Sequence, residues 1–255
     1  MTQPRDILPT IRELPPAAWV LFAGTFVNRF GSFVLVFLVL YLTDKGYSGP
    51  EAGLALAMYG LGQMAAATVG GHLADRLGRR TTIVISMYSA AGALVLLYHQ
   101  DALWAIMVMT FLVGATAELY RPAAAALLID LSEPGERVTV FAAYRMAINL
   151  GFMLGPAVGG LLAERSFGWL FYGDALTCVL FGTLAAVALP EGRRTSENVG
   201  LTESWRIILQ DRAFLRFLAG ATLIVIILFQ PSSGWALQVK AWGHPNATYG
   251  ALYPD

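Results

Sequence analysis

The amino-acid sequence predicts an all-α protein that spans a membrane several times. Of the 255 residues, 56% are apolar and 13% are charged, whereas soluble domains have roughly 45–50% and about 25%. The apolar residues form seven long segments with few charges: 17–43, 52–72, 81–99, 102–128, 138–163, 167–189 and 217–239. Each reaches or approaches the ~20 residues that a helix needs to cross a bilayer. Seven such segments joined by short polar turns argue against the core helices of a soluble enzyme.

The first six segments form one predicted unit, residues 1–189. Residues 190–216 are the longest polar stretch, and Trp205, Ile208 and Leu209 recur there at helical spacing beside Arg206. This pattern favours an amphipathic helix on the membrane surface, and a solvated linker is the alternative. Residues 217–255 contain the seventh segment and the start of an eighth.

Lysine and arginine are distributed unequally between the two sides of the membrane. Eleven fall on the side of the amino terminus: Arg5, Arg12, Arg76, Arg79, Arg80, Arg137, Arg193, Arg194, Arg206, Arg212 and Arg216. The opposite side has Lys45, Arg165 and Lys240. Because cytoplasmic loops carry the excess of positive residues, we expect a cytoplasmic amino terminus.

A short motif occurs twice. The sequence GGHLADR at Gly70–Arg76 recurs as GGLLAER at Gly159–Arg165, 89 residues later. The first copy ends the second segment on the predicted cytoplasmic side, and the second copy ends the fifth segment on the outer side. This placement supports two three-helix repeats of inverted topology, a common transporter architecture.

The first copy lies in a longer stretch, GGHLADRLGRRTTI, that resembles the signature loop of the major facilitator superfamily. The matching residues are Gly71, Leu73, Ala74, Asp75, Arg76, Gly78, Arg79 and Arg80. A second stretch, NLGFMLGPAVGG at Asn149–Gly160, is similar to the helix-five motif of the antiporter branches. DLSEPGER and LQDRAFLRFL resemble segments of bacterial drug:proton antiporters. The resemblance implies a six-helix amino-terminal bundle of 3+3 inverted repeats, followed by the start of a carboxyl-terminal bundle, in a bacterial inner membrane.

The resemblance also implies a cytoplasmic latch. Asp75 would cap a helix of the carboxyl-terminal half, and Arg79 would pair with Asp130 at the inner end of helix four. Charged hydrogen bonds are strong yet reversible at a wet boundary, and glycines at Gly71 and Gly78 allow a tight turn with positive φ. Positive-inside anchoring is the alternative explanation for the arginines.

The fifth apolar segment, residues 138–163, carries a glycine motif. Gly151, Gly155 and Gly159 lie on one helical face, where small residues permit close packing. Pro156 removes a backbone donor and can bend the helix, and Gly160 completes the motif. We expect this helix to act as a gate, with packing alone as the alternative.

Polar and charged side chains inside the segments mark the predicted transport pathway. Each intramembrane charge costs about 2.5–3.5 kcal/mol on insertion scales, so a functional role is expected. The residues are Asn28 and Arg29 in a polar stripe with Thr25 and Ser32, Gln63 beside Tyr59, Glu118 with Arg121, and Arg145 with Asn149.

Glu118 is the predicted proton carrier, because a carboxylate beside Arg121 can titrate as its hydration changes. Arg121 lies near the place of an antiporter arginine, although the glycines of that motif are absent. A static ion pair is the alternative role for Glu118. Asp174 lies nearer the outer boundary and is expected to be structural.

The predicted activity is proton-coupled export of a small organic molecule by alternating access, with helices one and four lining the cavity. Uptake by a carrier of the same fold is the main alternative, and a channel or a membrane-embedded enzyme are alternatives from other classes. The three histidines are scattered, and we expect no metal, cofactor or nucleic acid. Substrate, protons and the bilayer are the expected partners. Because two six-helix bundles must rock against each other, we expect transport to need a further carboxyl-terminal half.

Overall fold

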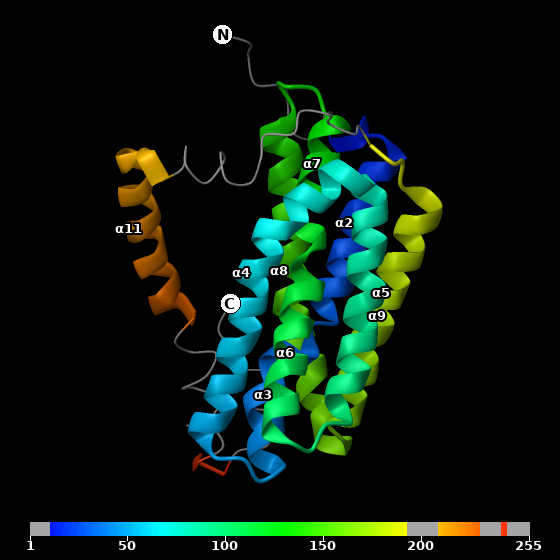
Figure 1. Ribbon diagram of the computed structural model, residues 1–255. Coiled ribbons are helices and arrows are strands. Elements are labelled where there is room, and N and C mark those ends of the chain that lie inside the picture. Colours follow the sequence, from blue (N-terminus) through cyan, green and yellow to red (C-terminus); the bar gives the residue numbers. More distant parts are fainter. Residues whose placement is uncertain (1–10, 193–208, 230–240, 244–255) are drawn as a thin grey trace.

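The chain forms a bundle of long helices in the computed structural model, which describes residues 11–192, 209–229 and 241–243 (Figure 1). Within these ranges there is no strand. The helices are α2 (Pro16–Phe30), α3 (Phe33–Asp44), α4 (Gly49–Leu77), α5 (Arg79–Tyr98), α6 (Leu103–Glu118), α7 (Tyr120–Asp130), α8 (Arg137–Arg165), α9 (Gly168–Ala188) and α11 (Arg212–Phe229). The predicted all-α membrane architecture is confirmed.

Six stretches of the described chain are long and apolar enough to cross a membrane. They match the first six predicted segments, but two of them are interrupted, which the sequence analysis did not foresee. The first span consists of α2 and α3, and the fourth consists of α6 and α7.

Polar side chains from neighbouring helices bind backbone groups at both interruptions. In the fourth span the Ser86 hydroxyl donates to the Thr116 carbonyl, 2.6 Å away, and accepts from the Tyr120 N–H at 3.0 Å. Ser86 thus stands between two groups that would otherwise bond within one helix, a known cause of helix distortion. In the first span Asp174 of α9 accepts the N–H of Val34 at 3.3 Å, just beyond Gly31 and Ser32.

The six spans form two equivalent sets of three. Their lengths are 29, 29 and 20 residues in the first set and 28, 29 and 21 in the second. The most extensive packing joins α2 with α8, α4 with α6, and α5 with α9. In each case a helix of one set packs against a helix of the other. The pair α2–α8 joins the first span of one set to the second span of the other set, and α4–α6 is the equivalent pair with the two sets exchanged. This is the packing expected of two inverted three-helix repeats.

Glycines allow these helices to approach closely. A Cβ added at Gly62 of α4 would lie 2.2 Å from the carbonyl oxygen of Phe111 in α6. A Cβ added at Gly151 of α8 would lie 2.8 Å from the backbone nitrogen of Phe30 in α2. Gly62 and Gly151 are 89 residues apart, the offset of the repeated motif.

The turn between α4 and α5 is a single residue, Gly78, with φ of 96°. Gly78 therefore has the positive φ that the signature stretch predicted. The same expectation is wrong for Gly71, because α4 continues to Leu77 and includes Gly71, Asp75 and Arg76. We call this end of the bundle the Gly78 end, and the opposite end, where α3 meets α4, the Lys45 end.

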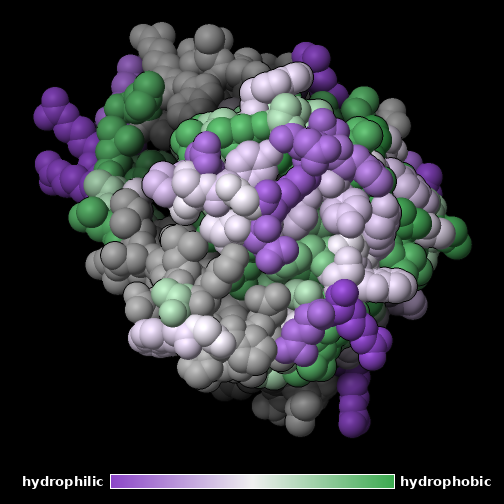
Figure 2. All heavy atoms as spheres, turned by 90° about the horizontal axis from the view of Figure 1, so that it is seen from below, coloured by the Kyte–Doolittle hydropathy of each residue, from purple (hydrophilic) through white to green (hydrophobic). Residues whose placement is uncertain are grey.

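The surface is apolar on the sides of the bundle and polar at its ends. Large apolar side chains are exposed along the sides, among them Ile85 at 42% and Leu180 at 52%. Figure 2 looks along the bundle and shows hydrophilic side chains gathered on the end face, with hydrophobic ones around them. Contiguous exposed apolar surface is rare in soluble monomers and suits contact with lipid.

The predicted seventh helix is described only in part. Helix α11 contains its first half and lies to one side of the six-span bundle (Figure 1). The rest of segment 217–239 and most of the predicted amphipathic helix lie outside the described residues.

Replacing Gly114 with alanine should push α4 away from α6, because the new methyl group would lie 2.2 Å from the carbonyl oxygen of Tyr59. Overpacking of this kind costs about 1–3 kcal/mol, so we expect a lower midpoint of thermal unfolding for the purified chain in detergent. Gly60→Ala in α4 is the matched control, since no atom of another helix in the described chain lies within 4 Å of its added Cβ. Equal midpoints for the two variants would contradict the close approach.

Candidate functional site

A buried ion pair joins the two interrupted spans. Arg29, near the end of α2, binds Glu118, the last residue of α6, through both terminal guanidinium nitrogens, Nη1 and Nη2. Nη1 lies 2.8 Å from Oε1 and Nη2 lies 3.1 Å from Oε2. Each side chain is only 4% exposed. Bidentate pairing of this kind is both strong and geometrically specific.

Arg29 and Glu118 are 89 residues apart, the offset of the repeated motif. They therefore occupy equivalent positions in the two three-helix repeats. The ion pair is a direct contact between the repeats at the level where both spans are interrupted.

Arg121, the partner of Glu118 expected from their spacing on one helix, is the second partner of Glu118. Its Nη1 lies 3.0 Å from Oε2 of Glu118. Its side chain is 49% exposed, whereas Arg29 is almost fully enclosed. The buried pairing across the bundle was missed because helical spacing reports only neighbours on the same helix.

Aromatic rings surround the buried guanidinium. The Arg29 Cζ atom lies 5.5 Å from the ring centre of Tyr120 and 5.4 Å from that of Phe152. Both distances are in the range of cation–π attraction. The Arg29 Nε has no hydrogen-bond partner among the described residues.

The other predicted pathway residues lie in different environments. Asn28 is buried and donates through Nδ2 to the Cys178 sulfur at 3.3 Å. Gln63 of α4 is half-buried, and Arg145 and Asn149 are exposed on α8. The structure does not bring Arg145 and Asn149 into the buried cluster around Glu118.

The glycines of the motif in α8, the fifth span, face the first span. Added Cβ atoms at Gly151, Gly155 and Gly159 would lie 2.5–2.8 Å from the nearest atoms of Arg29, Phe30 or Phe37. Pro156 and Gly160 are buried, and α8 continues through Pro156 as one element. The motif brings α8 against α2 and α3, beside the interruption of the first span.

A second ion cluster lies at the Gly78 end, formed by Arg79, Arg80, Asp130 and Glu191. Arg79 Nη1 lies 3.1 Å from Asp130 Oδ2, with side-chain exposures of 7% and 17%. This contact is an ion pair without an aligned hydrogen bond from Nη1 in the described part of the chain. Arg80 Nη2 lies 2.8 Å from Glu191 Oε1, and both side chains are more than a third exposed.

The chain following α9 completes this cluster. The carbonyl oxygen of Glu191 accepts the Arg79 N–H at 3.1 Å, and its carboxylate accepts the Thr81 hydroxyl at 3.3 Å. Gly192 packs so closely that an added Cβ would lie 2.8 Å from Arg79 Cδ. Asp75 and Arg76 are exposed near this end.

Glu191 was missed by the sequence analysis. Its signal was an isolated acid between Pro190 and Gly192, at the end of the sixth span and on the side of Arg79 and Arg80.

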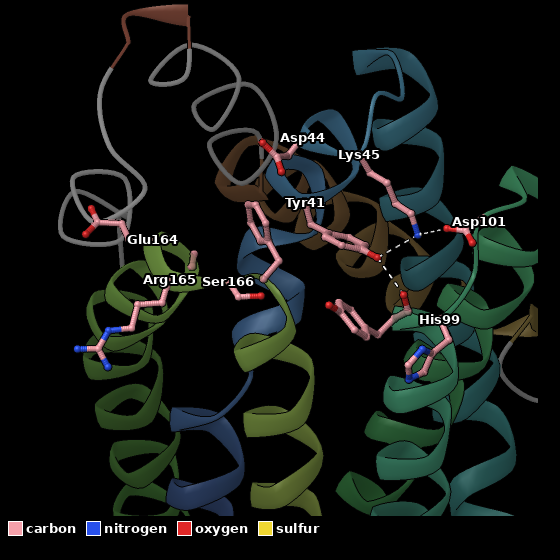
Figure 3. Close-up of a pocket in the computed structure, with 11 residues that line it drawn as sticks. Tyr41, Asp44, Lys45, His99, Asp101, Glu164, Arg165 and Ser166 are labelled. Carbon is pink, nitrogen blue, oxygen red and sulfur yellow. Dashed lines mark hydrogen bonds and ion pairs between the residues drawn. The ribbon is translucent and has the colours of Figure 1, made fainter.

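The Lys45 end holds an open, polar pocket of about 730 Å³ (Figure 3). Lys45 Nζ lies 2.8 Å from Asp101 Oδ1 and also donates to the Gln100 carbonyl and, at 3.3 Å, to the Tyr41 hydroxyl. Burial alone would lower the pKa of Lys45, but its bonds to Asp101 and Tyr41 raise that pKa overall. The bond and charge of Lys45 lower the pKa of Asp101. These contacts tie the end of α3 to the chain between α5 and α6.

Known proteins resemble this chain over most of its length. The profile of the Major Facilitator Superfamily matches residues 21–253. The uncharacterized MFS-type transporter YqjV of Bacillus subtilis (strain 168) is 28% identical over 251 residues, covering 94% of this chain and 61% of the relative. The quinolone resistance protein NorA of Staphylococcus aureus (strain MRSA252) is 27% identical over 214 residues, covering 83% and 54%. The chain thus spans little more than half the length of these relatives.

Solved structures show the same fold. The inward-facing, unoccupied structure of a bacterial homolog to the human lysosomal transporter Spinster has a TM-score of 0.74 at 16% identity, covering 93% of this chain and 58% of that one. A peptide transporter POT in complex with sulfate (E310Q mutant) has a TM-score of 0.63 at 19% identity, covering 89% and 50%. Six membrane-spanning stretches, two equivalent sets of three spans and the profile match agree, and the chain belongs to the major facilitator superfamily.

Proposed function

We propose that this chain supplies the amino-terminal bundle of a proton-coupled exporter of small organic molecules in a bacterial inner membrane. The observation that carries the proposal is the buried Arg29–Glu118 pair at the meeting point of the two repeats. Transport itself would belong to the assembly of this bundle with a second six-helix bundle, which alternating access requires.

Glu118 is the proposed proton-binding group of the cycle. A proton and the Arg29 guanidinium compete for the same carboxylate oxygens, so binding of the proton would release Arg29. A buried charge that loses its partner is strongly destabilised, and the released Arg29 must therefore move toward water or another anion. Arg121, whose side chain is already half exposed, would keep its contact with Glu118 when water enters the cavity. Proton binding would thereby break the ion pair that joins α2 to α6.

The proposed substrate is a small organic molecule with apolar and polar parts. Met64 on α4 and Met146 and Met153 on α8 are exposed large apolar side chains, and methionine adapts to irregular partners. Gln63, Arg145 and Asn149 add polar contacts on the same helices. The name of the relative NorA points to drug-like compounds.

Within the Gly78-end ion cluster, the Arg79–Asp130 pair is the proposed cytoplasmic latch, with the amino terminus inside the cell. Arg79 and Asp130 would stay paired while the carrier opens outward and separate when it opens inward. Asp75 and Arg76 are exposed there, free to contact the second bundle. The close contact of Gly151 and Gly155 with α2 would let α8 follow the movement of the first span.

Export and uptake by this fold differ in the direction of substrate movement relative to the proton gradient. A proteoliposome assay with an imposed pH gradient tests the proposal directly. Accumulation of substrate opposite to the proton flux supports export, and movement in the direction of the protons supports the uptake alternative.

Replacing Glu118 with glutamine in the complete carrier should abolish substrate accumulation driven by a pH gradient. The same change leaves Arg29 buried without a counter-charge, which destabilises a protein by roughly 3–5 kcal/mol. The double variant Arg29→Gln with Glu118→Gln is the control, because it removes both charges and should restore most of the thermal stability without restoring coupling. Proton-driven accumulation by Glu118→Gln at the wild-type rate would show that Glu118 is structural.

Replacing Asp130 with asparagine should weaken the proposed latch. Arg79 would lose its counter-ion while largely buried, and we expect a loss of about 1–3 kcal/mol in the free energy of unfolding. In the carrier, a cysteine placed in the central cavity should be alkylated faster from the cytoplasmic side. Glu191→Gln is the matched control, because its exposed pair with Arg80 contributes at most about 1 kcal/mol. Equal alkylation rates in Asp130→Asn and the wild type would exclude the latch role.

A further inference from the structure

A second carboxylate is buried inside the bundle. Asp174 is the seventh residue of α9, about 9 Å along that helix from the Lys45 end. Its side chain is 6% exposed. It lies beside Val34, about five residues along the first span from Arg29.

No lysine or arginine lies within ion-pair distance of Asp174 in the described part of the chain. Oδ2 accepts the Val34 N–H at 3.3 Å, and Oδ1 lies 3.9 Å from the Cys178 sulfur. The charged and titratable groups that face it from packed elements are Arg29 of α2, Tyr59 of α4 and Cys178 of α9. Arg29 is already committed to Glu118 of α6.

A small cavity adjoins Asp174. Its volume is about 20 Å³, and its lining includes Asn28, Arg29, Ser32, Tyr59, Asp174 and Cys178. One water molecule needs about 10–15 Å³ of such space and two to four polar partners. Arg29, whose buried Nε has no hydrogen-bond partner among the described residues, lines this cavity. The cavity therefore has the size and the polar groups to hold one water between Asp174 and Arg29.

We propose that Asp174 is a second proton-binding site of the carrier, linked to Arg29 through the cavity at the interruption of the first span. This inference rests on the proposed proton coupling and adds a carboxylate to it. A buried carboxylate without a cation is far more costly than the neutral acid. A proton from bulk water would bind Oδ1, the oxygen beside Cys178. Oδ2 would continue to accept the Val34 N–H, so the interruption of the first span persists in both states.

The two carboxylates share one arginine. When Glu118 binds a proton and releases Arg29, a deprotonated Asp174 is the nearest alternative anion on the cavity that Arg29 already lines. When Asp174 is protonated, that alternative is absent and Arg29 stays with Glu118. The proton on Asp174 would thus control where Arg29 resides.

Infrared spectroscopy of the purified chain in lipid tests the site directly, because a protonated carboxylic acid absorbs apart from carboxylates. We expect an acid band that persists at neutral pH in the wild type and disappears in Asp174→Asn. It should remain in the double variant Arg29→Gln with Glu118→Gln, which removes Glu118 together with the arginine that it would release toward Asp174. Asparagine keeps an oxygen that can accept the Val34 N–H, so the fold should survive. A neutral-pH spectrum without this band, or a band unchanged in Asp174→Asn, would overturn the inference.

If Asp174→Asn does not fold, Cys178→Ala decides instead. It removes the neighbour of Oδ1 but leaves the acid, so a shifted band supports the site and an unshifted band overturns it. Transport assays separate this inference from the proposed function. Proton-driven transport without the Asp174 band refutes the inference alone. The Asp174 band in a carrier that ignores the pH gradient refutes the proposed coupling and leaves the site standing.

Discussion

The ion pair between Arg29 and Glu118 is the constraint around which the bundle is arranged. In the interior of a membrane protein neither charge can be left alone, since an unpaired buried ion costs several kcal/mol. The ends of α2 and α6 must therefore stay within one bidentate contact, 2.8 and 3.1 Å long. Because the two residues sit at equivalent repeat positions, the contact also fixes how the two sets of three spans face each other. The first and fourth spans are both interrupted within three residues of this ion pair. The ion pair therefore lies next to the points where the helical backbone is irregular.

Polar insertions and glycine contacts make this arrangement possible. Ser86 and Asp174 take over backbone partners in the fourth and first spans, which frees these helices to bend beside the ion pair. Gly62 and Gly151 bring α4 against α6 and α8 against α2, so the same packing solution occurs in both repeats. In lipid, where the hydrophobic effect does not drive helices together, close packing at small residues supplies much of the association energy. Close helix packing at these glycines holds the first and fourth spans in place, and the buried charges of Arg29 and Glu118 lie where these two spans meet.

Much of this architecture could be predicted from the sequence. Apolar runs of about 20 residues gave the six spans, and the recurrence of GGHLADR as GGLLAER gave the two repeats. Tertiary pairings were harder, because spacing on one helix points to neighbours such as Glu118 and Arg121 and not to a partner on another span. The repeat offset contained the missing clue, since Arg29 and Glu118 differ by the same 89 positions. Gly71 was assigned a positive φ because a glycine-rich motif is typical of a turn, whereas the helix continues until Gly78. Glu191 was overlooked because a single acid carries no periodic signal.

The charges inside the bundle set a limit on how it can work. Arg29 is enclosed by Glu118, Tyr120 and Phe152, and Asp174 lies across a cavity of about 20 Å³ from the same side chain. One guanidinium can neutralise one carboxylate at a time, so a state in which both Glu118 and Asp174 are ionised leaves one of them uncompensated unless Arg121 or water reaches it. Arg121, which is half exposed, pairs with Glu118, and in the described part of the chain no ion pair joins it to Asp174. In the proposed cycle, the protonation of Glu118 and Asp174 and the position of Arg29 are therefore linked by electrostatics. A carrier built on this bundle would move its central arginine and its protons together.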